Sequence, residues 1–168
     1  ITAWIATPSV GAAISLYAAA RDQLGDDLTA FEFASQFTLE LVLKNIAGSR
    51  SPLARPSPWY LLMEVSTPRD DDGLEDHVQE FLVRMQEAGQ VSDGVVATSH
   101  AQRAALWGLR HSMSEAQKEE GASIKHDVSV PVARMEQFLI RATAAVEQLV
   151  PGVRVVAFGH LGDGNVHF

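Results

Sequence analysis

Two histidines near the end of the sequence have the residue type and spacing of a metal-ligand pair. His160 and His167 flank the segment Leu-Gly-Asp-Gly-Asn-Val. Asp163-Gly164 is a favoured pair for a two-residue type I′ turn, because both turn positions need a positive φ. A hairpin on this turn places His160 directly opposite His167, and directly opposed residues lie on one face with Cβ atoms roughly 5 Å apart. Two imidazoles in that arrangement can bind one metal ion.

The alternative is that these are two ordinary hairpin histidines without a ligand role. Two arbitrary histidines favour this alternative, but the dense glycine brings the two interpretations level, since glycine marks places where a backbone bends sharply or approaches a ligand closely. A catalytic zinc ion usually takes three protein ligands, and the sequence identifies no third. Other histidines are weaker candidates: His77 lies in an acidic segment, and His100 falls in the first turn of a predicted helix.

A second set of residues has the chemistry of an anion site. Arg110 and Ser114 are four positions apart, so they share one face if the segment is helical. Lys125 follows the end of that helix, at the start of a predicted strand that could return beside it. Arginine offers a bidentate fork to a carboxylate, and lysine adds a compact positive charge. Spacing alone favours the alternative, in which Arg110 pairs with a nearby acid and Lys125 is a surface residue.

Composition excludes several classes of protein. The 168 residues carry 13 Lys and Arg against 21 Asp and Glu, a net charge of −8, which argues against nucleic acid and anionic membrane surfaces as partners. The absence of cysteine excludes a disulfide framework, an iron–sulfur centre and a thiolate zinc site. No apolar run approaches the ~20 residues of a membrane span. Because the chain starts at Ile1 and stops at Phe168 within a predicted strand, we expect a fragment of a longer polypeptide.

Apolar alternation and run length predict short strands separated by helical segments. The predicted strands are Ala3–Thr7, Leu28–Phe33, Trp59–Val65, Val95–Thr98, Lys125–Val130 and Arg154–Gly159. The predicted helices are Val10–Gln23, Phe37–Ala47, Leu74–Ala88, a long helix from Ser99 to Glu120 and a last helix beginning at Pro131. The last helix has apolar residues three or four apart, which predicts one buried stripe of Val132, Met135, Leu139, Ala142, Val146 and Leu149.

This alternation of strands and helices favours the first of two fold classes, and it does not exclude the second. The first is an α/β fold with a parallel sheet, and the second is an α+β ferredoxin-like fold, in which alternating elements pair antiparallel. There is no Gly-x-Gly-x-x-Gly motif and no P-loop, so the chain is not itself a dinucleotide-binding unit of the Rossmann kind. The aspartates within Pro68–Gly73 lack the alternating spacing of a calcium loop and predict a solvated turn.

The segment Phe-Gly-His-Leu-Gly-Asp-Gly-Asn-Val-His resembles the signature of the FAD-linked oxidase C-terminal domain family. That family includes D-lactate dehydrogenase, D-2-hydroxyglutarate dehydrogenase and the glycolate oxidase flavin subunit. The resemblance covers nearly the whole chain, with further blocks at Ala30–Phe33, Leu61–Val65, Leu106–Arg110 and Ile124–Val132. It implies that residues 1–168 form an α+β C-terminal cap domain, with a ferredoxin-like antiparallel sheet and helices packed on one face. FAD is then held mainly by an N-terminal domain of the same polypeptide.

The resemblance also implies roles for the residues singled out above. His160 and His167 match the family histidines that ligate a divalent metal, usually zinc. The third ligand, a glutamate, and a histidine base are expected beyond the end of this chain. Arg110 matches the arginine that binds the substrate carboxylate, and Lys125 matches a second substrate-binding residue. Ser114 occupies a position that is threonine in the hydroxyglutarate branch.

The implied function is a metal-assisted, FAD-dependent oxidation. We expect part of a dehydrogenase or oxidase that converts a D-2-hydroxy acid of the D-lactate, D-2-hydroxyglutarate or glycolate class to the 2-oxo acid, and we expect the chain alone to be inactive. The alternatives are a flavoprotein of the same fold acting on a different alcohol and a non-catalytic metal-binding module. The expected partners are the hydroxy acid, the FAD domain and an unidentified electron acceptor, and a homodimer is allowed. The expected compartment is the cytoplasm, or the mitochondrion in a eukaryote.

Overall fold

The computed structural model of the chain describes residues 1–68 and 73–168, which build one antiparallel sheet. Its strands are β1 (Thr2–Thr7), β2 (Leu28–Ser35), β3 (Trp59–Val65), β4 (Asp93–Val96), β5 (Asp127–Ser129), β6 (Phe158–His160) and β7 (Asn165–His167). They lie in the order β4-β1-β3-β2-β6-β7-β5, and neighbouring strands are antiparallel throughout. The aspartates of the predicted turn at Pro68–Gly73 lie outside the described residues.

The first half of the chain has the ferredoxin-like arrangement. β1, α1 (Val10–Leu24), β2, β3, α3 (Leu74–Glu87) and β4 follow one another along the sequence, and their strands lie in the order β4-β1-β3-β2. β3 therefore lies between β1 and β2 and is antiparallel to both, as in a split βαβ unit. The predicted α+β class with an antiparallel sheet is confirmed, and the parallel-sheet alternative is wrong.

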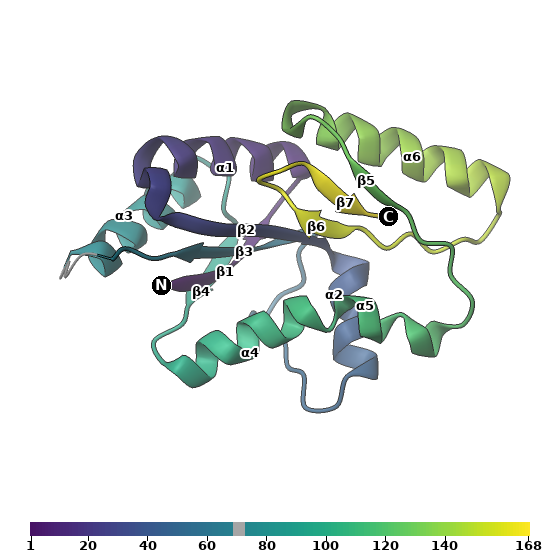
Figure 1. Cartoon of the computed structure of the whole chain (residues 1–168), viewed down its shortest axis with the longest axis horizontal. Helices are drawn as coiled ribbons and strands as arrows, with labels where there is room; N and C mark the ends of the chain where they lie inside the picture. The colour runs from purple at the N-terminus through teal and green to yellow at the C-terminus, as the bar shows by residue number, and fades with distance from the viewer. Residues whose placement is uncertain (69–72) are drawn as a thin grey trace.

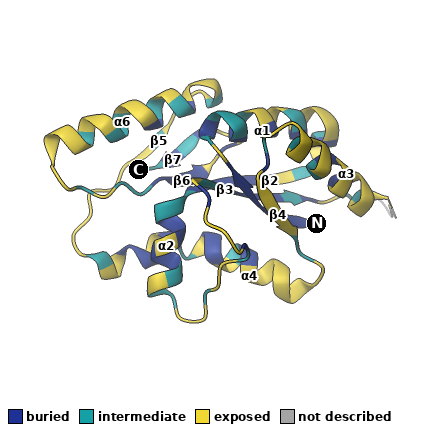
Figure 2. Cartoon of the chain, turned by 180° about the vertical axis from the view of Figure 1, so that it is seen from behind, coloured by how far each residue is buried: buried dark blue, intermediate teal, exposed yellow. Residues whose placement is uncertain are grey.

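Helices cover both faces of the sheet, whereas we expected them on one face. α1, α3 and α6 (Met135–Leu149) pack on one face, and α2 (Gln36–Asn45), α4 (His100–His111) and α5 (Met113–Ala116) pack on the other (Figure 1). The physical reason lies in the central strands, since the residues of β1 are all buried. A strand buried on both sides needs a helical layer on each. Figure 2 shows the buried residues along the middle strands and the exposed ones on the outer sides of the helices.

The predicted helix from Ser99 to Glu120 is divided. Ser99 begins α4 as expected, because its hydroxyl accepts a hydrogen bond from the backbone N–H of Gln102 at 3.2 Å. Ser112 then separates α4 from the single turn of α5. Arg110, near the end of α4, therefore does not belong to one long regular helix with the residues that follow it.

The predicted apolar stripe of the last helix is buried only in its first half. α6 begins at Met135 rather than at Pro131, and Met135 and Leu139 are buried in the core, whereas Leu149 is 79% exposed. Strands β5, β6 and β7 are each three residues long, too short to cover a helix of 15 residues, and α6 extends beyond them (Figure 1).

Within the described residues, no helix combines the length and the apolar character that a membrane span requires.

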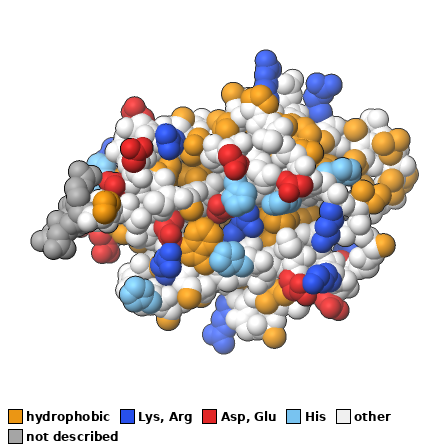
Figure 3. Space-filling view, viewed as in Figure 1, with side chains coloured by type: hydrophobic (Ala, Val, Ile, Leu, Met, Phe, Trp, Pro, Cys, Tyr) orange, Lys and Arg blue, Asp and Glu red, His pale blue; other side chains and the backbone are white. Residues whose placement is uncertain are grey.

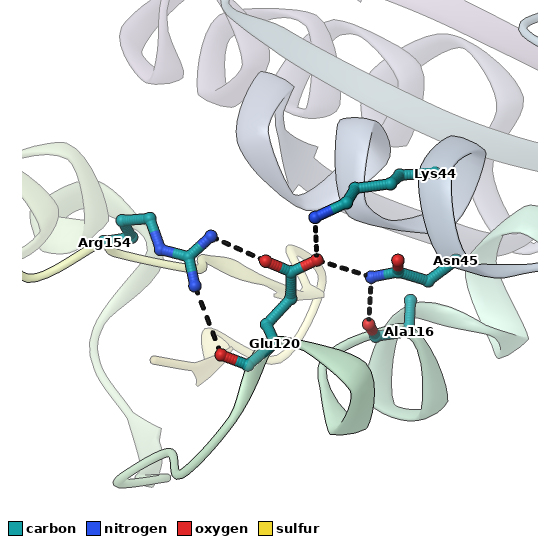
Figure 4. Close-up of polar contacts among 5 residues, drawn as sticks. All are labelled: Lys44, Asn45, Ala116, Glu120 and Arg154. Atoms are coloured by element: carbon teal, nitrogen blue, oxygen red, sulfur yellow. Dashed lines mark hydrogen bonds and ion pairs between the residues drawn. The ribbon is translucent and has the colours of Figure 1, made fainter.

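Glu120 ties the end of α2 to the segment that leads into β6 (Figure 4). Its carboxylate accepts hydrogen bonds from Lys44 Nζ at 2.6 Å, Asn45 Nδ2 at 2.8 Å and Arg154 Nη1 at 2.7 Å. These bonds from Asn45, Lys44 and Arg154 lower the pKa of Glu120 from 4.5 to about 2. The network thereby fixes the course of the chain before it reaches His160.

We expect Glu120→Gln to lower thermal stability at neutral pH and to make it less sensitive to acid. The folded-state pKa of Glu120 is depressed from 4.5 to about 2, so its contribution to stability is present above about pH 4.5 and is lost as the pH falls toward 2. The Tm difference from wild type should be largest at neutral pH and vanish near pH 2. Glu119→Gln, at the exposed neighbouring position, is the control. A Tm difference that persists unchanged to pH 2 would contradict this account.

Candidate functional site

The hairpin at the end of the chain forms in a different register from the predicted one. β6 and β7 pair His160 with Asn165 and Phe158 with His167. The prediction that His160 lies directly opposite His167 across a two-residue turn is therefore wrong. Residues 161–164 together connect the two strands.

Leu161 determines this register. Its side chain is fully buried in the core beneath α1, and its backbone N–H donates to Phe31 O of β2 at 2.9 Å rather than to the hairpin partner. Gly164 has a φ of +74°, but Asp163 has no positive φ, so the type I′ turn does not form. The burial of one large apolar side chain outweighs the local turn preference.

The two histidines nevertheless lie on one face of the hairpin. Side chains alternate along a strand, so Phe158 and His160 of β6 share a face with Asn165 and His167 of β7. The ring centroids of His160 and His167 are 6.4 Å apart, as suits diagonal neighbours. In Figure 3, histidine side chains gather with acidic and basic ones near the middle of the molecular face. The pair is thus brought together, and its role as metal ligands stays a prediction.

A buried carboxylate from the neighbouring strand organises this face. Glu32 lies opposite His160 in the β2–β6 ladder and is 5% exposed. Glu32 Oε1 is 2.8 Å from His160 Nδ1, and Glu32 Oε2 accepts a hydrogen bond from Arg110 Nε at 2.9 Å and forms an ion pair with Arg110 Nη2 at 2.9 Å. Glu32 was not among the predicted site residues. Its only sequence signal is a charged residue between Phe31 and Phe33 in an apolar strand.

Arg110 is buried where α4 ends against the sheet. It is 9% exposed, and its Cζ atom lies 5.2 Å from the centroid of the Phe158 ring, within the range of a cation–π contact. The Nε edge of the guanidinium faces Glu32, and Nη1 has no hydrogen-bond or ion-pair partner among residues 1–68 and 73–168. The interpretation that Arg110 pairs with a nearby acid therefore describes one edge of the group. The other edge has no such partner, and its binding of an anion stays a prediction.

His167 lies beside an acidic residue of the outermost strand. Asp127 is its partner in the β5–β7 ladder, and Asp127 Oδ1 is 3.7 Å from His167 Nδ1. Asn165 Nδ2 donates to the same oxygen at 2.6 Å. Burial lowers the pKa of His167; the Asp127 carboxylate opposes this effect, and the positive charge of Arg110 adds to it. The imidazole is therefore neutral at physiological pH, the form that binds metal ions.

Ser114 is not brought into contact with the arginine of the predicted anion site. It is exposed on α5, whereas Arg110 is buried on α4, and the two helices are separated at Ser112. No hydrogen bond joins Ser114 to Arg110 in the part of the chain that the structure describes. The expected contact of Ser114 with substrate stays a prediction.

Lys125 lies in the extended segment that leads into β5. The segment continues the sheet, because His126 and Phe168 exchange two backbone hydrogen bonds of 2.9 Å. Side chains alternate along an extended chain, so Lys125 is on the same side as Asp127, the partner of His167. The side chain of Lys125 is exposed. Its charge is thus near the histidine face, and its contact with substrate stays a prediction.

The polar groups of this face fit a partial metal site. Glu32 at Nδ1 of His160 and Asp127 near Nδ1 of His167 follow the pattern in which carboxylates orient metal-binding histidines. Asn165 Oδ1, on the same face, is buried and has no hydrogen-bond partner among the described residues. No group of three or more His, Cys, Asp or Glu that could hold a metal ion occurs within residues 1–68 and 73–168. The described chain thus offers two imidazoles to a metal, but not a complete ligand set.

The chain is similar in sequence to several curated proteins. It is 34% identical over 148 residues to the mitochondrial D-2-hydroxyglutarate dehydrogenase of Arabidopsis thaliana, covering 88% of this chain and 26% of that protein. It is 38% identical over 163 residues to the D-2-hydroxyglutarate dehydrogenase of Xanthomonas citri pv. viticola, covering 97% and 33%. With the mitochondrial enzyme of Rattus norvegicus the identity is 33% over 172 residues, covering 98% and 30%. The chain thus spans about a quarter to a third of the length of these relatives.

The whole chain also matches one protein family. Residues 1–168 match the family described as FAD linked oxidases, C-terminal domain. The antiparallel α+β fold agrees with the cap domain implied by the resemblance of the histidine segment. On the match over its full length and on its relatives, the chain belongs to the family of FAD-linked oxidase C-terminal domains.

Proposed function

We propose that the chain forms the substrate- and metal-binding part of an FAD-dependent dehydrogenase that oxidises a D-2-hydroxy acid to the 2-oxo acid. One observation carries this proposal: the ring centroids of His160 and His167 lie 6.4 Å apart on one face of the hairpin, and Glu32 contacts both His160 and Arg110. Imidazoles suit a divalent cation, and a buried guanidinium suits a carboxylate. The three relatives above are named D-2-hydroxyglutarate dehydrogenases, which supports a hydroxy acid as substrate.

His160 and His167 are the residues of this chain that would hold the metal, which we take to be zinc. When bound, FAD supplies a hydride acceptor and the divalent metal supplies a Lewis acid for the substrate hydroxyl. Burial keeps His167 neutral by lowering its pKa, so a proton does not compete for the ligand nitrogen at physiological pH. These two side chains come from adjacent strands of one hairpin, so a rigid backbone sets their separation.

Arg110 binds and orients the substrate carboxylate in this proposal. Arg110 is 9% exposed, and attraction between opposite charges is stronger in a partly desolvated site than in water. Lys125 adds a second positive charge, and the family resemblance assigns Ser114 to the substrate site as well. A chain with a net charge of −8 needs such local cations to attract an anionic substrate. The buried Arg110 therefore favours an acid over an uncharged alcohol.

Oxidation of a 2-hydroxy acid removes a hydride from C2 and a proton from the hydroxyl group. The base that takes this proton and the third metal ligand are expected from another part of the polypeptide. The electron acceptor and a homodimer stay expectations of the family resemblance. The names of the plant and rat relatives include the word mitochondrial, so the mitochondrion is the compartment that we propose if the protein is eukaryotic.

A D-hydroxy acid should reduce the flavin of the full-length protein that carries this chain. Under anaerobic conditions, D-2-hydroxyglutarate or D-lactate should bleach the flavin absorbance and L-lactate should not, because the site fixes the acid in one orientation. Removal of the metal by a chelator should slow the bleaching by at least about 100-fold. If no hydroxy acid bleaches the bound flavin, the function must be another flavin chemistry, while the family assignment stands.

The chain by itself should bind zinc weakly, through two ligands. In a zinc titration, His160→Ala should reduce the affinity by more than about tenfold, because one imidazole remains. His77→Ala is the matched control, since His77 is exposed on α3, on the other face of the sheet. Equal zinc binding by the wild-type chain and the His160→Ala variant would reject the ligand assignment.

Arg110→Lys in the full-length protein should reduce kcat/KM for the hydroxy acid by about 10–100-fold. Lysine keeps the charge but cannot reproduce both the hydrogen bond of Nε and the ion pair of Nη2 with Glu32, and a charge-assisted hydrogen bond contributes about 1.5–3 kcal/mol. Arg103→Lys is the control, because Arg103 lies on the same helix and also binds a glutamate of the sheet, Glu64, through its Nε and Nη2 atoms. A similar loss in both variants would point to the docking of α4 rather than to substrate binding.

A further inference from the structure

Glu32 joins the two kinds of side chain in the proposed site. Glu32 Oε1 is 2.8 Å from His160 Nδ1, and Glu32 Oε2 forms the hydrogen bond with Arg110 Nε and the ion pair with Arg110 Nη2. Because Glu32 is 5% exposed, water has little access to replace either partner. One carboxylate oxygen of Glu32 thus contacts His160, the predicted metal ligand, and the other contacts Arg110, the predicted substrate-binding residue.

Glu64 is a comparable carboxylate that only fastens α4 to the sheet. It lies on β3, on the same face as Glu32, and accepts hydrogen bonds from Arg103 Nε and Nη2 at 2.9 Å each and from Trp107 Nε1 at 2.7 Å. Thr2 Oγ1 donates to it at 2.9 Å. These contacts attach α4 to the sheet without involving a histidine. The contact between Glu32 and His160 is therefore not needed to dock the helix.

We infer that Glu32 is a positioning residue that sets the tautomer of His160 and the orientation of Arg110. An ionised carboxylate only accepts hydrogen bonds, so its contact with His160 requires the imidazole proton on Nδ1. The other ring nitrogen, Nε2, then carries the lone pair that a metal ligand needs. The same carboxylate holds the Nε edge of Arg110 and leaves Nη1 for an anion. The consequence for metal and substrate rests on the proposed function, whereas the tautomer does not.

The isosteric substitution Glu32→Gln separates the two kinds of contact. Its amide has one oxygen that accepts and one nitrogen that donates. Arg110 offers only donors, so the amide oxygen faces Arg110 and the amide N–H₂ faces His160 Nδ1. His160 can accept that hydrogen bond only if its proton is on Nε2. The variant therefore moves the imidazole proton of His160 from Nδ1 to Nε2, while Arg110 keeps an oxygen acceptor at position 32.

The first measurement is the ¹⁵N spectrum of the full-length, metal-free protein labelled only in histidine, with His160 assigned through His160→Gln. Wild type should show the proton on Nδ1 and an unprotonated Nε2, and Glu32→Gln should show the reverse. Glu64→Gln, the matched control, removes the other carboxylate beneath α4 and should leave the wild-type tautomer. A proton on Nε2 in the wild-type protein would overturn the inference, whether or not Glu32→Gln folds.

The second measurement is zinc affinity of the same full-length proteins, determined by competition with a chromophoric chelator. Glu32→Gln should bind zinc about 10–100-fold more weakly than wild type, and Glu64→Gln should stay within about twofold. Equal affinity in wild type and Glu32→Gln would overturn the positioning role. A wild-type protein that binds no zinc, and whose flavin no hydroxy acid bleaches, would contradict the proposed function instead. In that case the tautomer alone decides whether Glu32 positions His160.

Discussion

The buried ion pair between Glu32 and Arg110 is the interaction on which this face of the protein depends. Breaking a buried pair by removing one partner costs about 3–5 kcal/mol, because the remaining charge is left uncompensated. Glu32 on β2 therefore requires α4 to end where Arg110 can reach it, at 2.9 Å. The second oxygen of the same carboxylate meets His160 of β6. The Glu32 side chain thus links the sheet to α4 on one side and to the β6–β7 hairpin on the other.

Two other carboxylates, Glu64 and Glu120, hold the surrounding helices and loops against the sheet. Burial raises the pKa of Glu64, but hydrogen bonds from Arg103, Trp107 and Thr2 outweigh it, so that the pKa is lowered. Glu120 anchors the chain before β6 through Arg154 and the end of α2. Neither carboxylate touches a histidine of the hairpin. Stability and ligand binding can therefore be altered separately, which makes Glu64 a useful control for Glu32.

Sequence patterns predicted the elements better than their contacts. Strand β3 has the predicted bounds, since its apolar run is buried on both faces. The alternation of strands and helices, however, favoured a parallel sheet, and only the family resemblance predicted the antiparallel one. The histidine pair was found from its spacing, and its register was mispredicted because the burial of Leu161 outweighs the turn preference of Asp163-Gly164. Glu32 was missed because its partners lie 78 and 128 positions away. No local pattern encodes contacts over such separations.

The central claim is that a metal binds to the imidazoles of this hairpin, and the most direct test is zinc K-edge X-ray absorption of the zinc-loaded full-length protein. Our account predicts imidazole nitrogens at about 2.0–2.1 Å in the first coordination shell, from His160 and His167, with one imidazole fewer in His167→Ala. A shell of oxygen atoms alone, or a spectrum that His167→Ala leaves unchanged, would contradict it.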